Sequence, residues 1–266
     1  MIELRKITSM FVAFGIVTVL SLQAQAHELI LKPTSFKAAP GSDLAVELQS
    51  THVFIVKEEV EDISKIDAGV FADGKLTKSI LNGNDAELRI DFSVKVPEGN
   101  SSALIAANKS GDVWCVTPDG WKPGTRKAIE AEGIKVTRAS MTDKFTKAII
   151  NPSASDKNFA TVIGQELEVV PVTNPADAKM GQFFKVKVIH NGQPASTPVF
   201  ATYDGFVAEL ENTYAYYTES NSEGIANIKI TSPGIWIIRA AVDNLPGVEG
   251  EYDARNLRSI LTVEVK

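Results

Sequence analysis

The sequence predicts an all-β protein built as an antiparallel β-sandwich. Apolar and polar residues alternate along most of the chain, which is the pattern of strands that bury one face. Turn dipeptides separate these runs, and little of the chain has the period of a helix. The clearest alternating runs are residues 44–48, 88–96, 184–188, 236–242 and 261–265.

Local chemistry predicts where the turns and the few helical segments lie. Glycine next to Pro, Asn or Asp favours tight turns between short strands, a spacing typical of β-sandwiches. Helix is expected to be scarce, with a short helical turn or two within residues 58–66 and 125–131. The predicted turn dipeptides are Pro40-Gly41, Asp73-Gly74, Asn82-Gly83, Asp119-Gly120, Asn191-Gly192 and Pro233-Gly234.

A polar segment divides the predicted strands into two groups. Residues 151–158 contain a proline and have no apolar period, so they are expected to form a connection. The sequence therefore predicts two β regions that pack together. These are an N-terminal β domain over residues 27–150 and a C-terminal β-sandwich over residues 160–266.

The N-terminus has the features of a secretory signal. Basic residues precede an uncharged, mostly apolar stretch over residues 10–22, and Ala24 and Ala26 fit the small-residue rule for cleavage. The stretch has about 13 residues, fewer than the roughly 18 to 20 that span a bilayer as a helix. Residues 1–26 are therefore predicted to be a cleaved signal peptide, which makes His27 the first residue of the mature chain. The alternatives are an uncleaved anchor and cleavage after Ala24.

The mature chain is acidic and large enough for a sizeable core. Loss of Arg5, Lys6 and Glu3 with the signal leaves 240 residues, of which 25 are basic and 32 acidic, a net charge of −7. It contains no basic patch, so we expect no nucleic-acid binding. It contains no second apolar stretch of membrane-spanning length, so we expect no direct membrane insertion after cleavage.

Cysteine usage and motif content narrow the compartment and the class of protein. Cys115, the only cysteine, lies in the apolar run 113–116 and is expected to be a buried structural thiol. A single cysteine allows no intramolecular disulfide, which in an exported chain favours the periplasm of a Gram-negative bacterium. The sequence shows no serine-hydrolase, metalloprotease, P-loop or dinucleotide-binding motif. We therefore expect a periplasmic protein that is not an enzyme.

The histidines are the best candidates for chemistry. There are three in 266 residues, and one directly follows the predicted cleavage site. An N-terminal His27 carries an α-amine and an imidazole that together can close a chelate ring on a transition metal. His27 and His52 both have the strand phase of buried residues. If the strands of residues 27–32 and 44–54 are neighbours, three nitrogen ligands converge, a set that suits Cu(II) or Ni(II).

Further residues are candidates for completing such a site. Glu28, Glu58 or Glu59 can supply an oxygen ligand, although the acidic run 58–62 is also typical of a solvated loop. His190 is a third candidate histidine ligand. It ends a predicted strand just before a turn, so a hydrogen bond at the turn edge is the alternative role.

Aromatic residues offer a second kind of surface. Packing in the core or on a sheet face is their usual role in β-sandwiches, and a platform for sugar rings is the alternative. The residues concerned are Trp114, Trp121, Tyr214, Tyr216 and Tyr217.

Several motifs together resemble a known family. The N-terminal ones are His27-Glu28-Leu29-Ile30-Leu31-Lys32-Pro33, Pro40-Gly41 and Thr51-His52-Val53-Phe54. The later ones are residues 164–171, 184–188, 192–194, 198–203, 222–230 and 234–236. In these motifs the chain resembles exported bacterial proteins of unknown function that are described as periplasmic components of cobalt or nickel uptake systems. Its C-terminal half is similar to the transthyretin-like (prealbumin-like) or carboxypeptidase-regulatory type of immunoglobulin-like sandwich.

The resemblance implies metal capture beside a membrane uptake system, with His27 and His52 as the residues carried over. We therefore expect a periplasmic protein that binds Ni²⁺ or Co²⁺, with Cu²⁺ and Zn²⁺ as other options. It would deliver the ion to a membrane transporter component or buffer it. One alternative is a copper histidine-brace protein, either a carrier or an oxygenase. Another is a metal-free β-sandwich interaction module.

Overall fold

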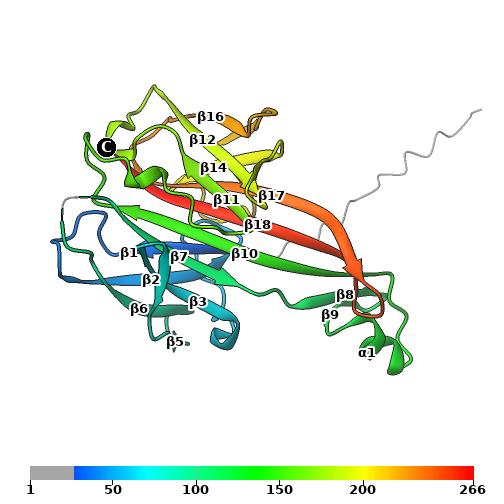
Figure 1. Ribbon diagram of the computed structural model, residues 1–266. Helices are drawn as coiled ribbons and strands as arrows, with labels where there is room; N and C mark the ends of the chain where they lie inside the picture. Colours follow the sequence, from blue (N-terminus) through cyan, green and yellow to red (C-terminus); the bar gives the residue numbers. More distant parts are fainter. Residues whose placement is uncertain (1–26, 100) are drawn as a thin grey trace, which may run out of the picture.

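The computed structural model describes residues 27–99 and 101–266, and β-strands are the main secondary structure of these residues (Figure 1). The predicted signal peptide, residues 1–26, lies outside the described residues. One α-helix, α1 (Arg126–Ala131), and three short 3-10 turns occur in the part of the chain that is described. No helix there is long and apolar enough to cross a membrane.

The strands form one long sheet and two small ones. The first small sheet has the order β1 (Glu28–Pro33), β2 (Asp43–Thr51), β6 (Arg89–Lys95), β5 (Asn82–Asn84). The other small sheet has the order β11 (Leu167–Pro171), β12 (Phe183–His190), β13 (Gln193–Pro194), with β16 (Ile225–Lys229) also paired to β12. Both pack against the long sheet, and each encloses its own apolar core (Figure 1).

The long sheet runs through the whole molecule. Its order is β15 (Tyr216–Glu219), β14 (Pro198–Tyr203), β17 (Gly234–Val248), β18 (Tyr252–Val265), β10 (Arg138–Ile150), β7 (Ala103–Lys109), β3 (Ile66–Ala72), β4 (Lys75–Lys78). A hairpin of β8 (Val113–Thr117) and β9 (Gly120–Pro123) extends it beside β10. The sheet is antiparallel except where β10 and β18 pair in parallel.

Strand β10 lies between the two cores because its side chains alternate in direction. Ala148 and Ile150 belong to the core shared with β1, β2 and β6. Ile149, which points the other way, belongs to the core shared with β11, β12 and β16. The two β regions therefore meet in one sheet. The domain limits 27–150 and 160–266 stay a prediction, and the segment between them includes a 3-10 turn at Asn158–Ala160.

The predicted fold class, an all-β protein of packed antiparallel sheets, is confirmed. Two predicted turns have the backbone of two-residue hairpins. Asp73 and Gly74 have φ values of 51° and 74°, and Asn191 and Gly192 have φ values of 50° and 74°. Positive φ at both central positions is the requirement of a type I′ turn, which favours Asn-Gly and Asp-Gly.

Two local expectations are wrong. Asn82-Gly83 lies inside strand β5, where it pairs with β6, and the turn comes after it at residues 85–88. Leu88 is part of that turn, with φ of 50° and 41% of its side chain exposed, so the strand begins one residue later than predicted. The two expected helical turns are confirmed: Ile63–Lys65 is a 3-10 turn within 58–66, and Arg126–Ala131 forms α1, capped by Thr125.

A buried ion pair connects the long sheet to the second small sheet. Lys147 on β10 lies 2.6 Å from Glu168 on β11, and the two side chains are 1% and 0% exposed. The Glu168 carboxylate also accepts hydrogen bonds from the backbone N–H groups of Ile163 and Gly164. The Lys147 ammonium and two backbone N–H groups therefore stabilise the negative charge of Glu168 in a site closed to solvent.

We expect Lys147→Met to lower the free energy of unfolding by about 3 kcal/mol, because it leaves the Glu168 charge buried without its cation. Urea unfolding at pH 7 measures this. The control is Lys95→Met, which removes an exposed pair with Asp43 and is expected to change little. If both substitutions lowered the free energy of unfolding equally, Lys147 and Glu168 would not form a buried ion pair.

Candidate metal site

The pairing of β1 with β2 brings His27 and His52 together. Glu28 pairs with Thr51 in the antiparallel register, so His27, which precedes Glu28, lies opposite His52, which follows Thr51. The two imidazole ring centroids are 4.0 Å apart. His52 follows the last residue of β2, where Thr51 closes a bend by accepting a hydrogen bond from the Val53 N–H at 3.0 Å.

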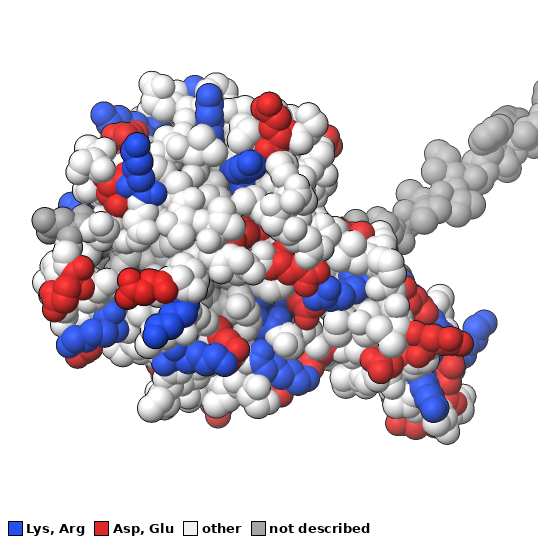
Figure 2. Space-filling view, in the orientation of Figure 1, with Lys and Arg blue, Asp and Glu red and all other residues white. Residues whose placement is uncertain are grey.

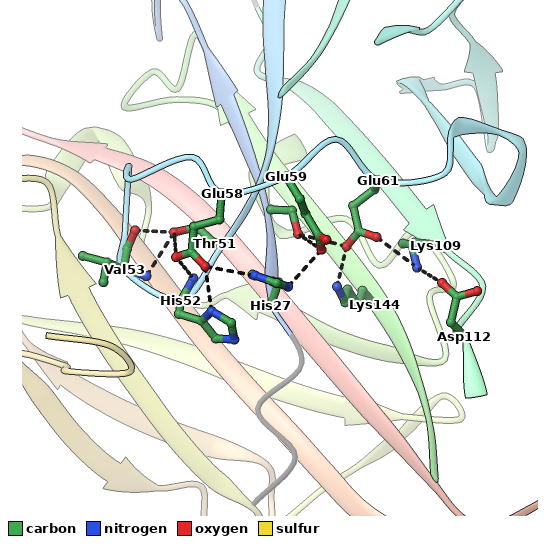
Figure 3. A network of polar contacts seen from close by, with 11 residues as sticks. His27, Thr51, His52, Val53, Glu58, Glu59, Glu61, Lys109, Asp112 and Lys144 are labelled. Carbon is green, nitrogen blue, oxygen red and sulfur yellow. Dashed lines mark hydrogen bonds and ion pairs between the residues drawn. The ribbon is translucent and has the colours of Figure 1, made fainter. Parts of the chain in front are cut away.

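The carboxylate of Glu58 contacts one nitrogen of each ring (Figure 3). Its Oε2 is 2.9 Å from His27 Nε2 and 2.7 Å from His52 Nδ1. Its Oε1 accepts a hydrogen bond from the His52 backbone N–H at 2.7 Å. One ligand atom from each of His27, His52 and Glu58 lies within 4.8 Å of the other two. These residues therefore form a compact set of two imidazoles and one carboxylate.

Glu59 holds the other nitrogen of His27. His27 Nδ1 is 2.9 Å from Glu59 Oε1, which also accepts a hydrogen bond from the Ser50 hydroxyl at 3.1 Å. The bond from His27 lowers the pKa of Glu59 to about 2. Burial acts to lower the pKa of His27, but its hydrogen bond to Glu59 and the charges of Glu59 and Glu58 outweigh burial, and the pKa is raised.

Glu58 is also kept ionised. Burial would raise its pKa, but the hydrogen bonds from the His52 backbone and ring, with the charge of the two histidines, lower it. An ionised carboxylate beside two imidazoles is a donor set that first-row transition metals accept. Both side chains are partly exposed, at 26% for His27 and 27% for Glu58, so solvent reaches the cluster.

A second cluster of charged side chains, centred on Glu61, lies beside the cluster of His27, His52 and Glu58. Glu61 lies 2.5 Å from the ammonium of Lys144 on β10 and 3.2 Å from that of Lys109 on β7, and Lys109 also contacts Asp112 at 2.9 Å (Figure 3). The Glu61 side chain is only 9% exposed. The expectation of a solvated loop at 58–62 is therefore wrong for Glu61, because lysines from two strands of the long sheet neutralise its charge.

Sequence reasoning missed these lysines, although a signal was present. Lys144 shares the strand phase of Ala148 and Ile150, and Lys109 shares that of Ala103 and Ile105, all of which are buried. A lysine in the apolar phase of a strand indicates a buried charge that needs an anionic partner.

Other predicted site residues lie elsewhere. His190, at the end of β12 in the other small sheet, is outside the three-residue cluster and lies 3.2 Å from the side-chain amide of Asn191 and 4.0 Å from Glu166. Glu28 is 4% exposed and forms an ion pair with Arg239 on β17. It points away from His27 because adjacent residues of a strand face opposite sides.

The remaining candidates divide into buried and exposed groups. Cys115 is fully buried on β8, and burial raises the pKa of its thiol. Trp114 and Trp121 are 44% and 37% exposed, so they do not pack in a core.

Tyr214 packs against Phe200 with ring centroids 5.1 Å apart. Tyr217 contacts the same ring at 5.1 Å, yet 54% of its side chain is exposed.

Basic and acidic side chains are mixed on the displayed surface, as expected for a sequence without a basic patch. Figure 2 shows basic side chains interspersed with acidic ones on the displayed face. The expectation that the protein does not bind nucleic acid stays a prediction.

The fold and the cluster together define an all-β protein with a candidate metal site where its first strand begins. The chain belongs to the family described as Domain of unknown function (DUF4198), whose model matches residues 24–244. The matched region contains the whole cluster. A comparison with curated proteins gives no match.

Two solved structures are similar over most of the chain at low scores. One is the D0-D1 domain of intimin, with 10% identity, a TM-score of 0.22, and coverage of 90% of this chain and 99% of that one. The other is the adhesin InvE of Yersinia pseudotuberculosis, with 12% identity, a TM-score of 0.21, and coverage of 88% and 58%. At such scores the fold assignment rests on the strand pairing itself.

The His27–Glu59 pair predicts how the stability of the metal-free protein depends on pH. Because folding raises the pKa of His27, protonation of this ring stabilises the folded state. The contribution is complete below pH 6.5 and is lost as the pH rises through the pKa of His27 in the folded protein. Because folding lowers the pKa of Glu59, the ionised carboxylate also stabilises the folded state. This contribution is complete above pH 4.5 and is lost as the pH falls toward 2. Both contributions are present together between these limits.

We therefore expect Glu59→Gln to lower the melting temperature most at about pH 5 to 6, and less above the raised pKa of His27. Thermal unfolding of the metal-free protein across this range measures the difference. Glu249→Gln, at the exposed tip of the β17–β18 hairpin, is the control. A difference that does not vary with pH would show that the two side chains do not form a charged pair.

Proposed function

We propose that this is a periplasmic metal-binding protein that holds one divalent transition-metal ion, Ni²⁺ or Co²⁺, through His27, His52 and Glu58. The convergence of these three side chains at one end of the β1–β2 pair carries the proposal. The protein would deliver the ion to a membrane transporter component or buffer it. In this role the metal is cargo and no reaction is catalysed.

The donor set supports a transition metal over a hard cation. Imidazole suits nickel, copper, zinc and cobalt, whereas calcium and magnesium prefer all-oxygen sites. The N-terminal histidine, the Thr51-His52 motif and the resemblance to periplasmic components of cobalt or nickel uptake systems favour nickel or cobalt. The same resemblance supports a transthyretin-like C-terminal sandwich. The predicted signal peptide, residues 1–26, supports export to the periplasm.

The two ring nitrogens of His27 permit two modes of binding. Nε2 faces Glu58 and Nδ1 faces Glu59. A chelate with the free α-amine uses Nδ1, so Glu59 must then leave that nitrogen. Binding through Nε2 instead keeps Glu59 as an outer carboxylate that orients the ring, as is common for metal-bound histidine. Only the first mode needs cleavage after Ala26.

A second candidate is a copper histidine-brace protein. An N-terminal histidine and one further histidine supply its three nitrogen ligands, and the exposed side chains of Trp114 and Trp121 are the observation that favours it. Redox behaviour separates the two proposals. A brace oxygenase consumes a reductant with oxygen or peroxide when loaded with copper, and a nickel or cobalt carrier does not.

We expect His52→Ala and Glu58→Gln each to weaken Ni²⁺ binding by at least about 100-fold, because loss of an outer partner alone costs about 10- to 100-fold. Titration calorimetry of protein processed to a native His27 terminus, with Ni²⁺, Co²⁺, Cu²⁺ and Zn²⁺, measures this. His190→Ala is the matched control and should bind with unchanged affinity. Absence of binding by the processed protein would reject both metal proposals and leave a metal-free interaction module.

The role of the α-amine has its own test. If the ion is held by Nδ1 and the α-amine, a form that keeps a methionine before His27 binds Ni²⁺ at least about 100-fold more weakly, because the chelate ring cannot close when the amine is an amide. Equal affinity of the extended and processed forms would show that the side chains alone make the site.

A further inference from the structure

A cavity of about 420 Å³ begins at the candidate metal site. His27 and Glu59 line it, as do Lys144, Trp114 and Trp121. His27 is thus a member of both the three-residue cluster and the cavity. Nδ1 of His27 faces Glu59, which also lines the cavity, so an ion held by this nitrogen and the α-amine would lie at the edge of an open space large enough for a small organic molecule.

The two tryptophans present their rings to this cavity because of the β8–β9 register. Val116 pairs with Trp121 and Trp114 pairs with Pro123, so both indoles lie on one face of the hairpin. Cys115, which points to the other face, is fully buried. Two large rings that line a cavity and stay partly exposed are suited to contact the flat face of a ligand.

The charged side chains that line the cavity determine which net charge a ligand can carry there. Four carboxylates and two ammonium groups line it: Glu59, Glu61, Asp62, Asp112, Lys109 and Lys144. Both lysines are already paired with Glu61, at 2.5 and 3.2 Å. The excess of negative charge disfavours a free organic anion and favours a neutral or cationic ligand.

In the chelate mode the α-amine and Nδ1 of His27 are two donors, which do not complete a six-coordinate ion, so positions on the cavity side can be taken by a ligand. We propose that the cavity holds a small chelator of the metal, with a flat ring and a carboxylate, so that the cargo is a metal chelate rather than a bare ion. The inference rests on the proposed metal site. A divalent metal with one monoanionic chelator carries a net positive charge, which fits the acidic cavity, while its ring lies against Trp114 and Trp121.

Pyridine-2-carboxylate is the probe, because it has a flat ring and chelates through its nitrogen and carboxylate. Pyridine-3-carboxylate has the same ring and charge but cannot chelate, and glycinate chelates but has no ring. Titration calorimetry and tryptophan fluorescence of the full processed protein compare Ni²⁺ alone, each organic ligand alone, and the preformed 1:1 mixtures.

We expect the nickel complex of pyridine-2-carboxylate to bind at least about 10-fold more tightly than Ni²⁺ alone, since stacking on an aromatic side chain contributes about this much. The gain should disappear in Trp114→Ala and Trp121→Ala, which should keep the affinity for Ni²⁺ alone. Phe183→Ala, which removes an exposed ring on β12, is the control and should keep the gain.

The outcomes separate this inference from the proposed function. Binding of Ni²⁺ without any gain from the chelator would overturn the inference and leave the metal site standing. A gain that survives both tryptophan substitutions, or equal binding of the two pyridine carboxylates without metal, would also overturn it. No binding of either Ni²⁺ or its complex would reject the proposed function itself.

Discussion

The parallel pairing of β10 with β18 is the constraint on which the architecture depends. It joins the sheet formed by the N-terminal strands to the sheet formed by the C-terminal strands, and makes them one. Because β10 alternates its side chains, Ala148 and Ile150 close one core while Ile149 and Lys147 close the other. The same strand supplies Lys144 to the group beside the candidate metal site.

The candidate site depends on this sheet for its charge balance. Several carboxylates follow one another in the loop after β2, and like charges so close together repel in a partly dehydrated setting. Two imidazoles hold Glu58 and Glu59, and two lysines hold Glu61. In the metal-free protein, the raised pKa of His27 favours a protonated ring, which supplies positive charge to the loop. A metal ion would replace that proton, which is why metal binding and proton release are coupled at such sites.

The location of the cluster at one end of β1 gives it two different neighbourhoods. The loop from residue 58 to 62 supplies carboxylates to the histidines. The β8–β9 hairpin supplies the exposed Trp114 and Trp121 to the same cavity. The indoles lie on strands β8 and β9, the two histidines directly adjoin the ends of β1 and β2, and the carboxylates come from a loop.

The convergence of His27 with His52 was predicted only if their two strands are neighbours, a condition that the β1–β2 pairing supplies. The sequence by itself determined the strand pattern and the two tight Asx-Gly hairpins. Alternation and turn chemistry act over a few residues, so these features can be read locally. It did not show the turn at Leu88, the burial of Glu61, or the exposure of the tryptophans. Only the tertiary structure decided these, because they depend on which strands become neighbours. The parallel pairing of β10 with β18, between segments more than a hundred residues apart, leaves no signal in either segment alone.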